Sequence, residues 1–277
     1  MADTVALSPG VSRAAVNTGA TLWTSSFIVA GRLLRKFART PQLIAFTAIQ
    51  SALFLLMFRF AFGGAIKSGG SLSYVSFLVP GFIATTVLWS GMGAATGVAE
   101  DVDHGFIDRL RSLPIPRAAV LIGRSLADTA LLLWGLVIAT IFGFAVGFRL
   151  HGSIAAALAA FGLCVVFGFA FEWIFILIGL VSGNAQAAQQ MGLVITPLVF
   201  LSAAYVPVAS MPAGVRQFGE YQPVTPMVDA VRRLTTGAQG QALLPHSIAH
   251  YVGISLLWAA AITAVFGILA VLRFAQR

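Results

Sequence analysis

Six long apolar stretches constrain this sequence more than any other feature. They run approximately over residues 42–62, 74–99, 118–148, 153–181, 186–208 and 247–272. About 20 apolar residues in a helix cross the roughly 30 Å of hydrocarbon in a bilayer, so each stretch is long enough for one crossing. A helix also satisfies its own backbone polar groups in lipid. The pattern therefore predicts an all-α polytopic membrane protein with six transmembrane helices.

The scarcity of charge agrees with this prediction. Of the 277 residues, 58% are hydrophobic and only 9% are charged, and the mean hydropathy is +0.92. Soluble domains carry about 25% charged residues, so this composition excludes a soluble enzyme. The six stretches leave no room for a sizeable domain outside the membrane.

The net charge of +8 indicates membrane topology rather than a nucleic-acid partner, because positive residues accumulate on the cytoplasmic side of membrane proteins. With the N-terminus inside, eleven of the 17 cations fall on that side. The other six are Arg59, Lys67, Arg149, Arg216, Arg232 and Arg233. We therefore expect both termini to be cytoplasmic.

The predicted spans define one transmembrane domain. We expect a cytoplasmic tail over residues 1–22, the membrane domain over 23–272 and a cytoplasmic C-terminus over 273–277. The first twenty residues lack the apolar core of a signal peptide, so the first helix is expected to insert as an internal signal.

Residues 23–40 predict an interfacial helix. At 100° per residue, apolar side chains cluster about one direction and cations about the opposite one. The apolar residues are Trp23, Phe27, Leu34 and Phe37 together with Ala30, and the cations are Arg32, Arg35, Lys36 and Arg39. Such a helix lies along the membrane surface with its cations toward headgroups. A short basic cap on the first span is the alternative.

The region 100–117, between the second and third stretches, is the most polar part of the chain. Phe106, Leu110 and Leu113 follow helical spacing and predict a short helix with an apolar stripe that needs a partner. The charged residues beside this stripe are Asp108, Arg109 and Arg111. A solvated loop is the alternative, and the nearby carboxylates with His104 fit no metal-ligand spacing. Farther on, Arg124 and Asp128 share one face, which indicates that the third span starts in the cytosol.

The external region 208–237 is too broken to span the membrane and too apolar to be a free loop. Its prolines are Pro212, Pro223 and Pro226, and Pro207 precedes it. We expect short re-entrant helices in the outer leaflet. An extracellular loop without regular structure is the alternative.

Four segments together resemble a known family. They are Gly105-Phe106-Ile107-Asp108-Arg109-Leu110-Arg111-Ser112-Leu113-Pro114-Ile115-Pro116-Arg117, Gly123-Arg124-Ser125-Leu126-Ala127-Asp128, Pro197-Leu198-Val199-Phe200-Leu201-Ser202-Ala203-Ala204-Tyr205-Val206-Pro207, and Gln222-Pro223-Val224-Thr225-Pro226 with Val231-Arg232. With the six-span layout, they resemble the permease subunits of ABC type-2 exporters, in the daunorubicin/doxorubicin-resistance branch. The combination covers nearly the whole chain.

The resemblance implies a bacterial plasma-membrane permease that exports hydrophobic or amphiphilic compounds, either drugs or lipids. It also implies an N-terminal elbow helix, a coupling helix in the first cytoplasmic loop and re-entrant helices before the last span. Two permease domains, the second being another copy or a paralogue, would pair and bind two separate ATPase subunits. An ABC exporter of a lipid-linked glycan is an alternative.

The sequence itself lacks an ATP site. It contains no Gly-x-x-x-x-Gly-Lys-Ser/Thr motif, and Lys36 and Lys67 are its only lysines. We therefore expect no enzymatic activity and no cofactor in this chain, with ATP and magnesium bound by the partner subunit. The stripe of Phe106, Leu110 and Leu113 is the candidate docking element for that partner.

Glu172 is the one carboxylate deep within a predicted span. An ionisable group at such depth is costly and by default indicates function, so we predict a place in the translocation path or at the seam between permeases. The alternatives are a protonated or hydrogen-bonded packing residue, and the coupling carboxylate of a stand-alone secondary transporter.

Overall fold

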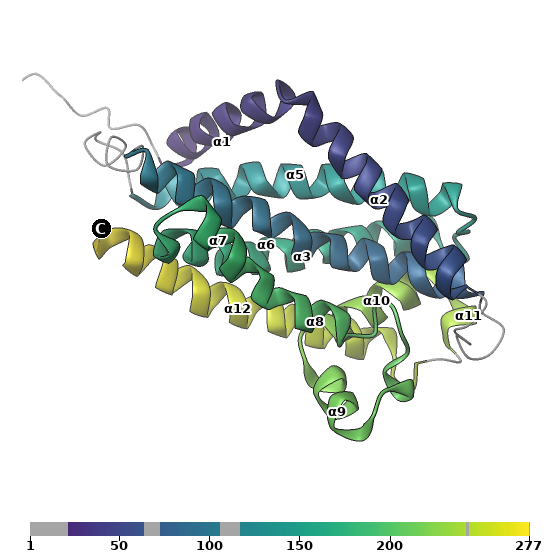
Figure 1. Cartoon of the computed structure of the whole chain (residues 1–277). Coiled ribbons are helices and arrows are strands. Elements are labelled where there is room, and N and C mark those ends of the chain that lie inside the picture. Colours follow the sequence, from purple (N-terminus) through teal and green to yellow (C-terminus); the bar gives the residue numbers. More distant parts are fainter. Residues whose placement is uncertain (1–21, 64–72, 106–116, 242–243, 277) are drawn as a thin grey trace, which may run out of the picture.

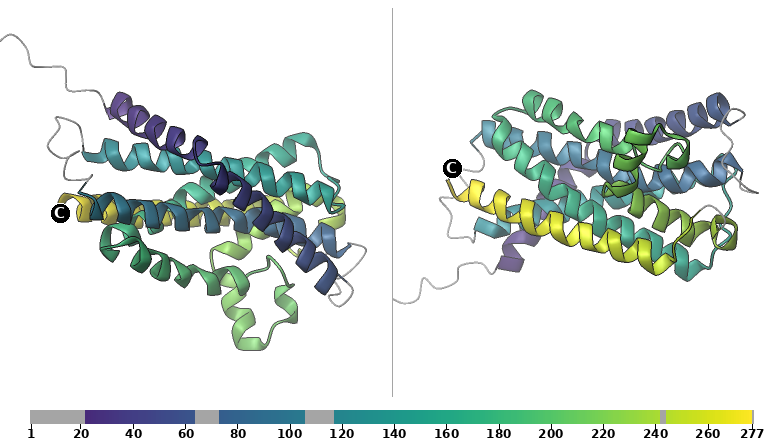
Figure 2. Two further views of the ribbon diagram at one scale, coloured as in Figure 1. Left: turned by 45° about the horizontal axis from the view of Figure 1, so that its top comes forward. Right: turned by 90° about the horizontal axis from the view of Figure 1, so that it is seen from below.

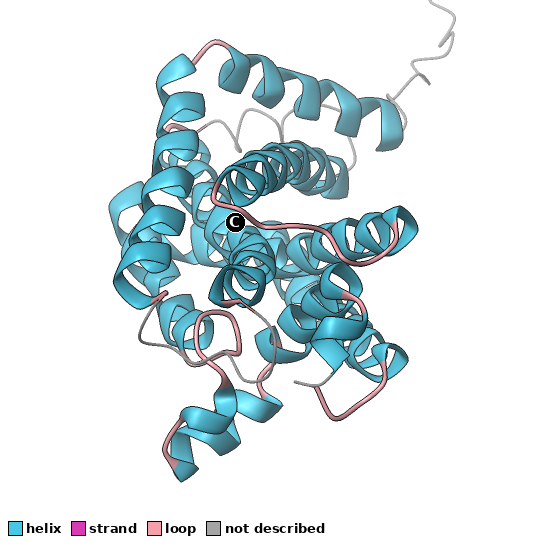
Figure 3. Cartoon of the chain, turned by 90° about the vertical axis from the view of Figure 1, so that its right-hand side faces the viewer, coloured by secondary structure: helices cyan, strands magenta, loops and turns pink. Residues whose placement is uncertain are grey.

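The protein is described here from a computed structural model covering residues 22–63, 73–105, 117–241 and 244–276. Every regular element in these ranges is a helix (Figure 3). The five longest are α2 (Pro41–Phe62), α3 (Tyr74–Asp103), α5 (Arg117–Ala145), α6 (Ile154–Ser182) and α12 (Ile248–Gln276). All five are long and apolar enough to cross a membrane. The prediction of an all-α membrane protein is therefore confirmed.

The helix ends follow from local chemistry. Ser73 and Ser153 cap α3 and α6, because their side-chain oxygens accept from the main-chain N–H groups of Ser76 and Ala156 at 3.2 and 3.1 Å. Pro41 occupies the first turn of α2, where its missing N–H costs nothing. Gly183 ends α6 in the left-handed conformation at φ 81°.

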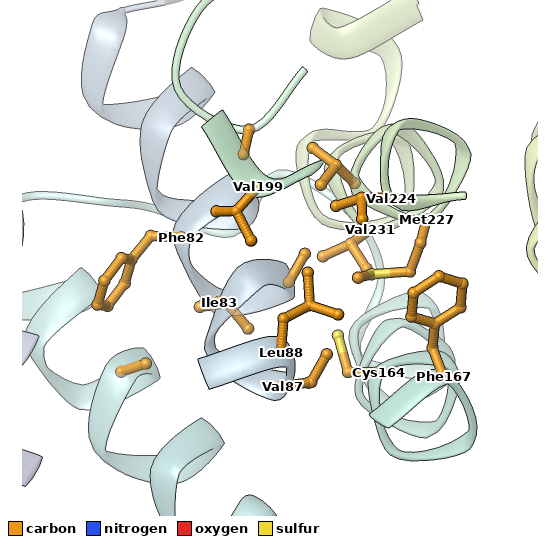
Figure 4. Close-up of a cluster of buried hydrophobic side chains, with 14 of the residues drawn as sticks. Phe82, Ile83, Val87, Leu88, Cys164, Phe167, Val199, Val224, Met227 and Val231 are labelled. Carbon is orange, nitrogen blue, oxygen red and sulfur yellow. The ribbon is translucent and has the colours of Figure 1, made fainter. Parts of the chain in front are cut away.

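Helix α3 lies at the centre of the bundle, in contact with α5, α6 and the shorter α7 (Ala185–Gly192) and α10 (Val224–Thr236). In its apolar window 72% of the residues are buried, against 17% for α2 at the periphery (Figures 1 and 2). The core shown in Figure 4 joins these elements. It includes Val87 and Leu88 of α3, Cys164 and Phe167 of α6, Val199 of α8 (Thr196–Phe200), and Val224, Met227 and Val231 of α10.

The predicted fifth span is not one long helix. It consists of α7, the 3₁₀ turn η1 (Leu193–Ile195) and α8, and the chain leaves helical structure after Phe200. Pro197 explains the break, since it has no N–H to donate to the carbonyl of Leu193. That carbonyl instead accepts from Thr196, one residue earlier, which tightens the turn. The described residues therefore contain five uninterrupted helices of membrane-spanning length, not the six that we predicted.

Residues 208–237, which we predict to be external, contain short helices, and their re-entrant placement stays a prediction. These helices are η2 (Val208–Ser210), α9 (Ala213–Tyr221) and α10, and α11 (Ala238–Gln241) follows directly after them. Helix α9 projects from the bundle, whereas every residue of α10 is buried (Figure 1). We call the end of the bundle where α3 ends and α5 begins the loop end, and the opposite end the α10 end.

Candidate functional site: two buried charge networks

A network of charged residues centred on Arg124 lies near the loop end. The Arg124 Nε donates to Asp128 Oδ2 at 2.6 Å on the same helix, and Nη1 lies 3.3 Å from Asp101 Oδ2 on α3. Nη2 donates to the main-chain oxygens of Gly93 and Ala94, at 3.3 and 3.5 Å. A single side chain of α5 thus contacts positions about two turns apart on α3.

Arg124 and Asp128 of this network are buried in the protein. They are 9% and 7% exposed, so they face other helices of the bundle, and the start of the third span in the cytosol stays a prediction. Buried ions persist only where partners compensate their desolvation. Here the two carboxylates and the α3 carbonyls provide those partners.

Gly97 gives the guanidinium the space it occupies. A Cβ atom at this position would lie 2.3 Å from Arg124 Nη2 and 2.9 Å from Nη1, well inside van der Waals contact. Gly93, four residues earlier on α3, has open space at the corresponding position. Of these two glycines, only Gly97 leaves space that the Arg124 guanidinium fills.

Glu172 continues the polar contacts into α6. Its Oε2 accepts from Ser125 Oγ at 3.0 Å and from Thr129 Oγ1 at 3.4 Å, both on α5. The side chain is 3% exposed, so in this conformation it faces the interior of one chain. Its place in the translocation path or at a dimer seam stays a prediction.

A second network lies around Arg232 on α10. Its Nη1 donates to Asp229 Oδ1 at 2.8 Å, Nε to the Phe77 oxygen at 3.2 Å and Nη2 to the Ala203 oxygen at 2.7 Å. The guanidinium carbon also lies 3.8 Å from the centroid of the Phe77 ring. These contacts attach α10 to α3 and to the turn that follows α8.

The two ends of the predicted coupling region are described, but its middle is not. Phe106, Asp108, Arg109, Leu110, Arg111 and Leu113 all lie outside the described residues. Immediately before them, Glu100 forms an ion pair with Lys36 of α1 (Leu22–Ala38), at 3.9 Å. This exposed pair and the partly buried Arg124–Asp101 pair connect α3 to two neighbouring helices at the loop end.

The predicted interfacial helix corresponds to α1. It packs on α5 through small residues: a Cβ at Gly123 would lie 2.5 Å from the main-chain oxygen of Ser26, and Ala30 is buried. Phe37 is half-buried, and the other predicted residues are exposed. The exposed ones are Trp23, Phe27, Arg32, Leu34, Arg35, Lys36 and Arg39.

Comparison with known proteins identifies the family. The family model described as ABC-2 type transporter matches residues 24–235, which include the Arg124 network and nearly all of α1 and α10. The chain belongs to the ABC-2 type transporter family. In this family the chain is the transmembrane permease subunit, and the ATPase is a separate component.

Named relatives fall in one branch of the family. The daunorubicin resistance ABC transporter permease protein DrrB1 of Streptomyces coeruleorubidus is 28% identical over 210 residues, covering 76% of this chain and 74% of DrrB1. The probable doxorubicin resistance ABC transporter permease proteins DrrC of two Mycobacterium tuberculosis strains are 25% identical over 234 residues, covering 84% of this chain and 82% of each. The resemblance in the sequence motifs is thereby confirmed.

Sequence reasoning missed partners of the buried charged side chains in both networks. The pair of Asp229 and Arg232 has a visible signal, opposite charges three residues apart, but Arg232 is interpreted from the sequence only as an external cation. The contact of Arg124 with Asp101 joins residues on different helices and has no spacing signal.

Proposed function

We propose that this chain exports hydrophobic or amphiphilic compounds across the bacterial plasma membrane as the permease subunit of an ABC transporter. The observation that carries the proposal is the family match over residues 24–235, on a chain whose described part is a bundle of apolar helices. The names of the relatives, which refer to daunorubicin and doxorubicin resistance, support a drug-like cargo. A lipid is a cargo of the same chemical class.

In this proposal two ATPase subunits dock at the loop end, and a second copy or a paralogue completes the path. The apolar stripe of Phe106, Leu110 and Leu113 enters a groove of the ATPase, with Asp108, Arg109 and Arg111 at its border. ATP and magnesium bind in that partner subunit. The charge of residues 100–117 supports a docking role, because this is the most polar of the stretches that connect the apolar ones.

The proposed topology has six crossings with both termini in the cytoplasm. The fifth crossing is the broken segment of α7, η1 and α8, whose non-helical end is buried in protein, at Ser202 and Ala204. Irregular backbone at membrane depth is tolerated where protein covers it. Helices α9 to α11 then form the re-entrant external region, and α1 lies in the inner interface with Trp23 and Phe27 toward lipid.

The docking assignment is tested with Leu110→Asp. We expect the variant to reach the membrane at wild-type levels but to lose co-purification of the ATPase, because a carboxylate in an apolar groove is left unpaired on binding. Phe218→Asp is the matched control, since Phe218 is an exposed aromatic on α9 at the other end of the molecule. If the ATPase co-purifies equally with both variants and efflux survives, the docking assignment is wrong.

The stand-alone secondary transporter is the competing function. It requires Glu172 to bind and release protons during each cycle, so Glu172→Gln would abolish transport. In the proposed exporter the glutamine oxygen accepts from the Ser125 and Thr129 hydroxyls as the carboxylate does. Transport by Glu172→Gln over a range of pH therefore separates the two functions.

A further inference from the structure

The helices on either side of the proposed docking loop are tied together by one side chain. Residue 104 follows α3, and α5 begins at Arg117. Across this gap, Arg124 of α5 contacts Asp101, less than one turn from the end of α3, and the Gly93 and Ala94 carbonyls two turns earlier. A force on the loop therefore acts on two helices that the Arg124 guanidinium holds together.

The contact is built to hold a fixed geometry. The planar guanidinium has five N–H donors in a rigid fork, and its acceptors on α3 and α5 approach from different directions. Gly97 leaves the room on α3 that the fork occupies. Sliding α3 along α5 would break several hydrogen bonds of a buried cation at once, which is unfavourable in a low-dielectric interior.

Polar contacts beyond Arg124 also join α5 to α6, farther into the bundle. Ser125 follows Arg124 in sequence, and Thr129 is one turn farther along α5; both donate to Glu172 of α6. Helix α6 in turn packs extensively along α12. A displacement at the loop end thus has a continuous, buried polar route into the centre of the bundle.

We propose that Arg124 is a positioning residue that makes α3 and α5 move as one body, so that ATPase-driven displacement of their connecting loop reaches α6. This inference rests on the proposed function. Asp101 and the α3 carbonyls form the link between the helices. Asp128 has a different part: it lies on the same helix as Arg124 and orients the guanidinium without joining two helices.

This difference between two aspartates provides the test. Asp101→Asn weakens the link between helices, whereas Asp128→Asn is a matched change in a carboxylate that contacts the same guanidinium. The Asp101 side chain is 27% exposed, so its substitution is the milder of the two for folding. Spin labels are placed at His104 and Leu133, exposed positions beyond α3 and on α5, in a Cys164→Ala background of the permease–ATPase complex.

Electron–electron distances are measured without nucleotide and with ATP and vanadate. We expect the wild type and Asp128→Asn to give the same narrow distance distribution in both states. In Asp101→Asn we expect the distribution to broaden and to shift when ATP and vanadate are added, with ATP hydrolysis retained. A residue needed only for stability would lower the melting temperature of Asp101→Asn without producing this nucleotide-dependent shift.

Two results overturn the inference: a wild-type distance that changes with ATP and vanadate, or an Asp101→Asn distribution identical to that of the wild type. Failure of the proposed function looks different. In that case no ATPase co-purifies with the wild-type chain, whereas the nucleotide-free distributions of the variants still report whether Asp101 ties the two helices.

Discussion

Arg124 and Arg232 are both buried, and the same kinds of hydrogen-bond partners surround their guanidinium groups. Each is bound by a carboxylate on its own helix and by main-chain carbonyls of another segment. One carboxylate uses at most two of the five N–H donors of a guanidinium, so the carbonyls satisfy donors that would otherwise be left unpaired. In both places the arginine adds polar contacts between segments that also share the apolar core.

The fit of Arg124 against α3 predicts the effect of a single methyl group. Gly97→Ala puts a Cβ atom where the guanidinium lies and should lower the stability of the protein by about 1–3 kcal/mol through overpacking. Gly93→Ala, whose Cβ enters open space, should have no such cost. Thermal unfolding of the two purified variants in detergent measures the difference. Equal melting temperatures would show that the Arg124 side chain does not occupy the space at Gly97.

Only part of this residue-scale arrangement could be predicted from the sequence. The shared face of Arg124 and Asp128 follows from helical periodicity, and the depth of Glu172 follows from hydropathy. Their burial could not be predicted, because the decisive partners lie on other helices: Asp101 and the α3 carbonyls for Arg124, and Ser125 with Thr129 for Glu172. A contact between two helices produces no periodic pattern in the sequence of either helix.

At the scale of elements, the difference between α10 and α9 organises the external region. Both are short helices with polar residues, yet α10 is wholly buried and α9 is exposed. Arg232 accounts for the difference in position, since it binds the Phe77 and Ala203 carbonyls. Gly81 allows the Ala204 carbonyl to approach α3 closely, because a Cβ there would lie only 2.1 Å from that oxygen.

Removing the Arg232 guanidinium should therefore detach α10 from α3. We expect Arg232→Met to lower the free energy of unfolding by about 3–5 kcal/mol, because Asp229 is left as an uncompensated buried charge. Arg216→Met is the control, since the Arg216–Glu220 pair on α9 is exposed and such pairs contribute about 0–1 kcal/mol. Unfolding both variants in the same mixed micelles gives the comparison. Similar losses would contradict the assigned role of Arg232.

The elements themselves were largely predictable, with one exception. Lipid requires long, uninterrupted apolar helices, so the bounds of α2, α5, α6 and α12 differ from the predicted spans by only a few residues. The segment 186–208 is not a single helix as predicted. Pro197 has no main-chain N–H, and hydropathy carries no information about the helix hydrogen bond that is lost there. The structure of the coupling helix at Phe106–Leu113 stays a prediction, since it lies outside the described residues.

At the scale of the whole molecule, the proposed topology depends on the broken segment α7–η1–α8. If it crosses, α9 is outside and the C-terminus is inside; if it does not, both positions are reversed. In a Cys164→Ala background, we expect Gly214→Cys to react with a membrane-impermeant maleimide in intact cells and Gln276→Cys to be protected. Gly214 suits the label because its Cβ direction is open. The reverse labelling pattern would rule out a crossing by α7–η1–α8.

The central claim is that this chain moves its cargo by using ATP hydrolysed in another subunit. The most direct measurement is uptake of doxorubicin and other amphiphilic dyes into inverted membrane vesicles containing the chain with or without its co-expressed ATPase. We predict accumulation that requires both the ATPase and ATP, is lost with a non-hydrolysable analogue, and survives a protonophore. Uptake that proceeds without the ATPase and collapses with the protonophore would contradict the account and establish a secondary transporter.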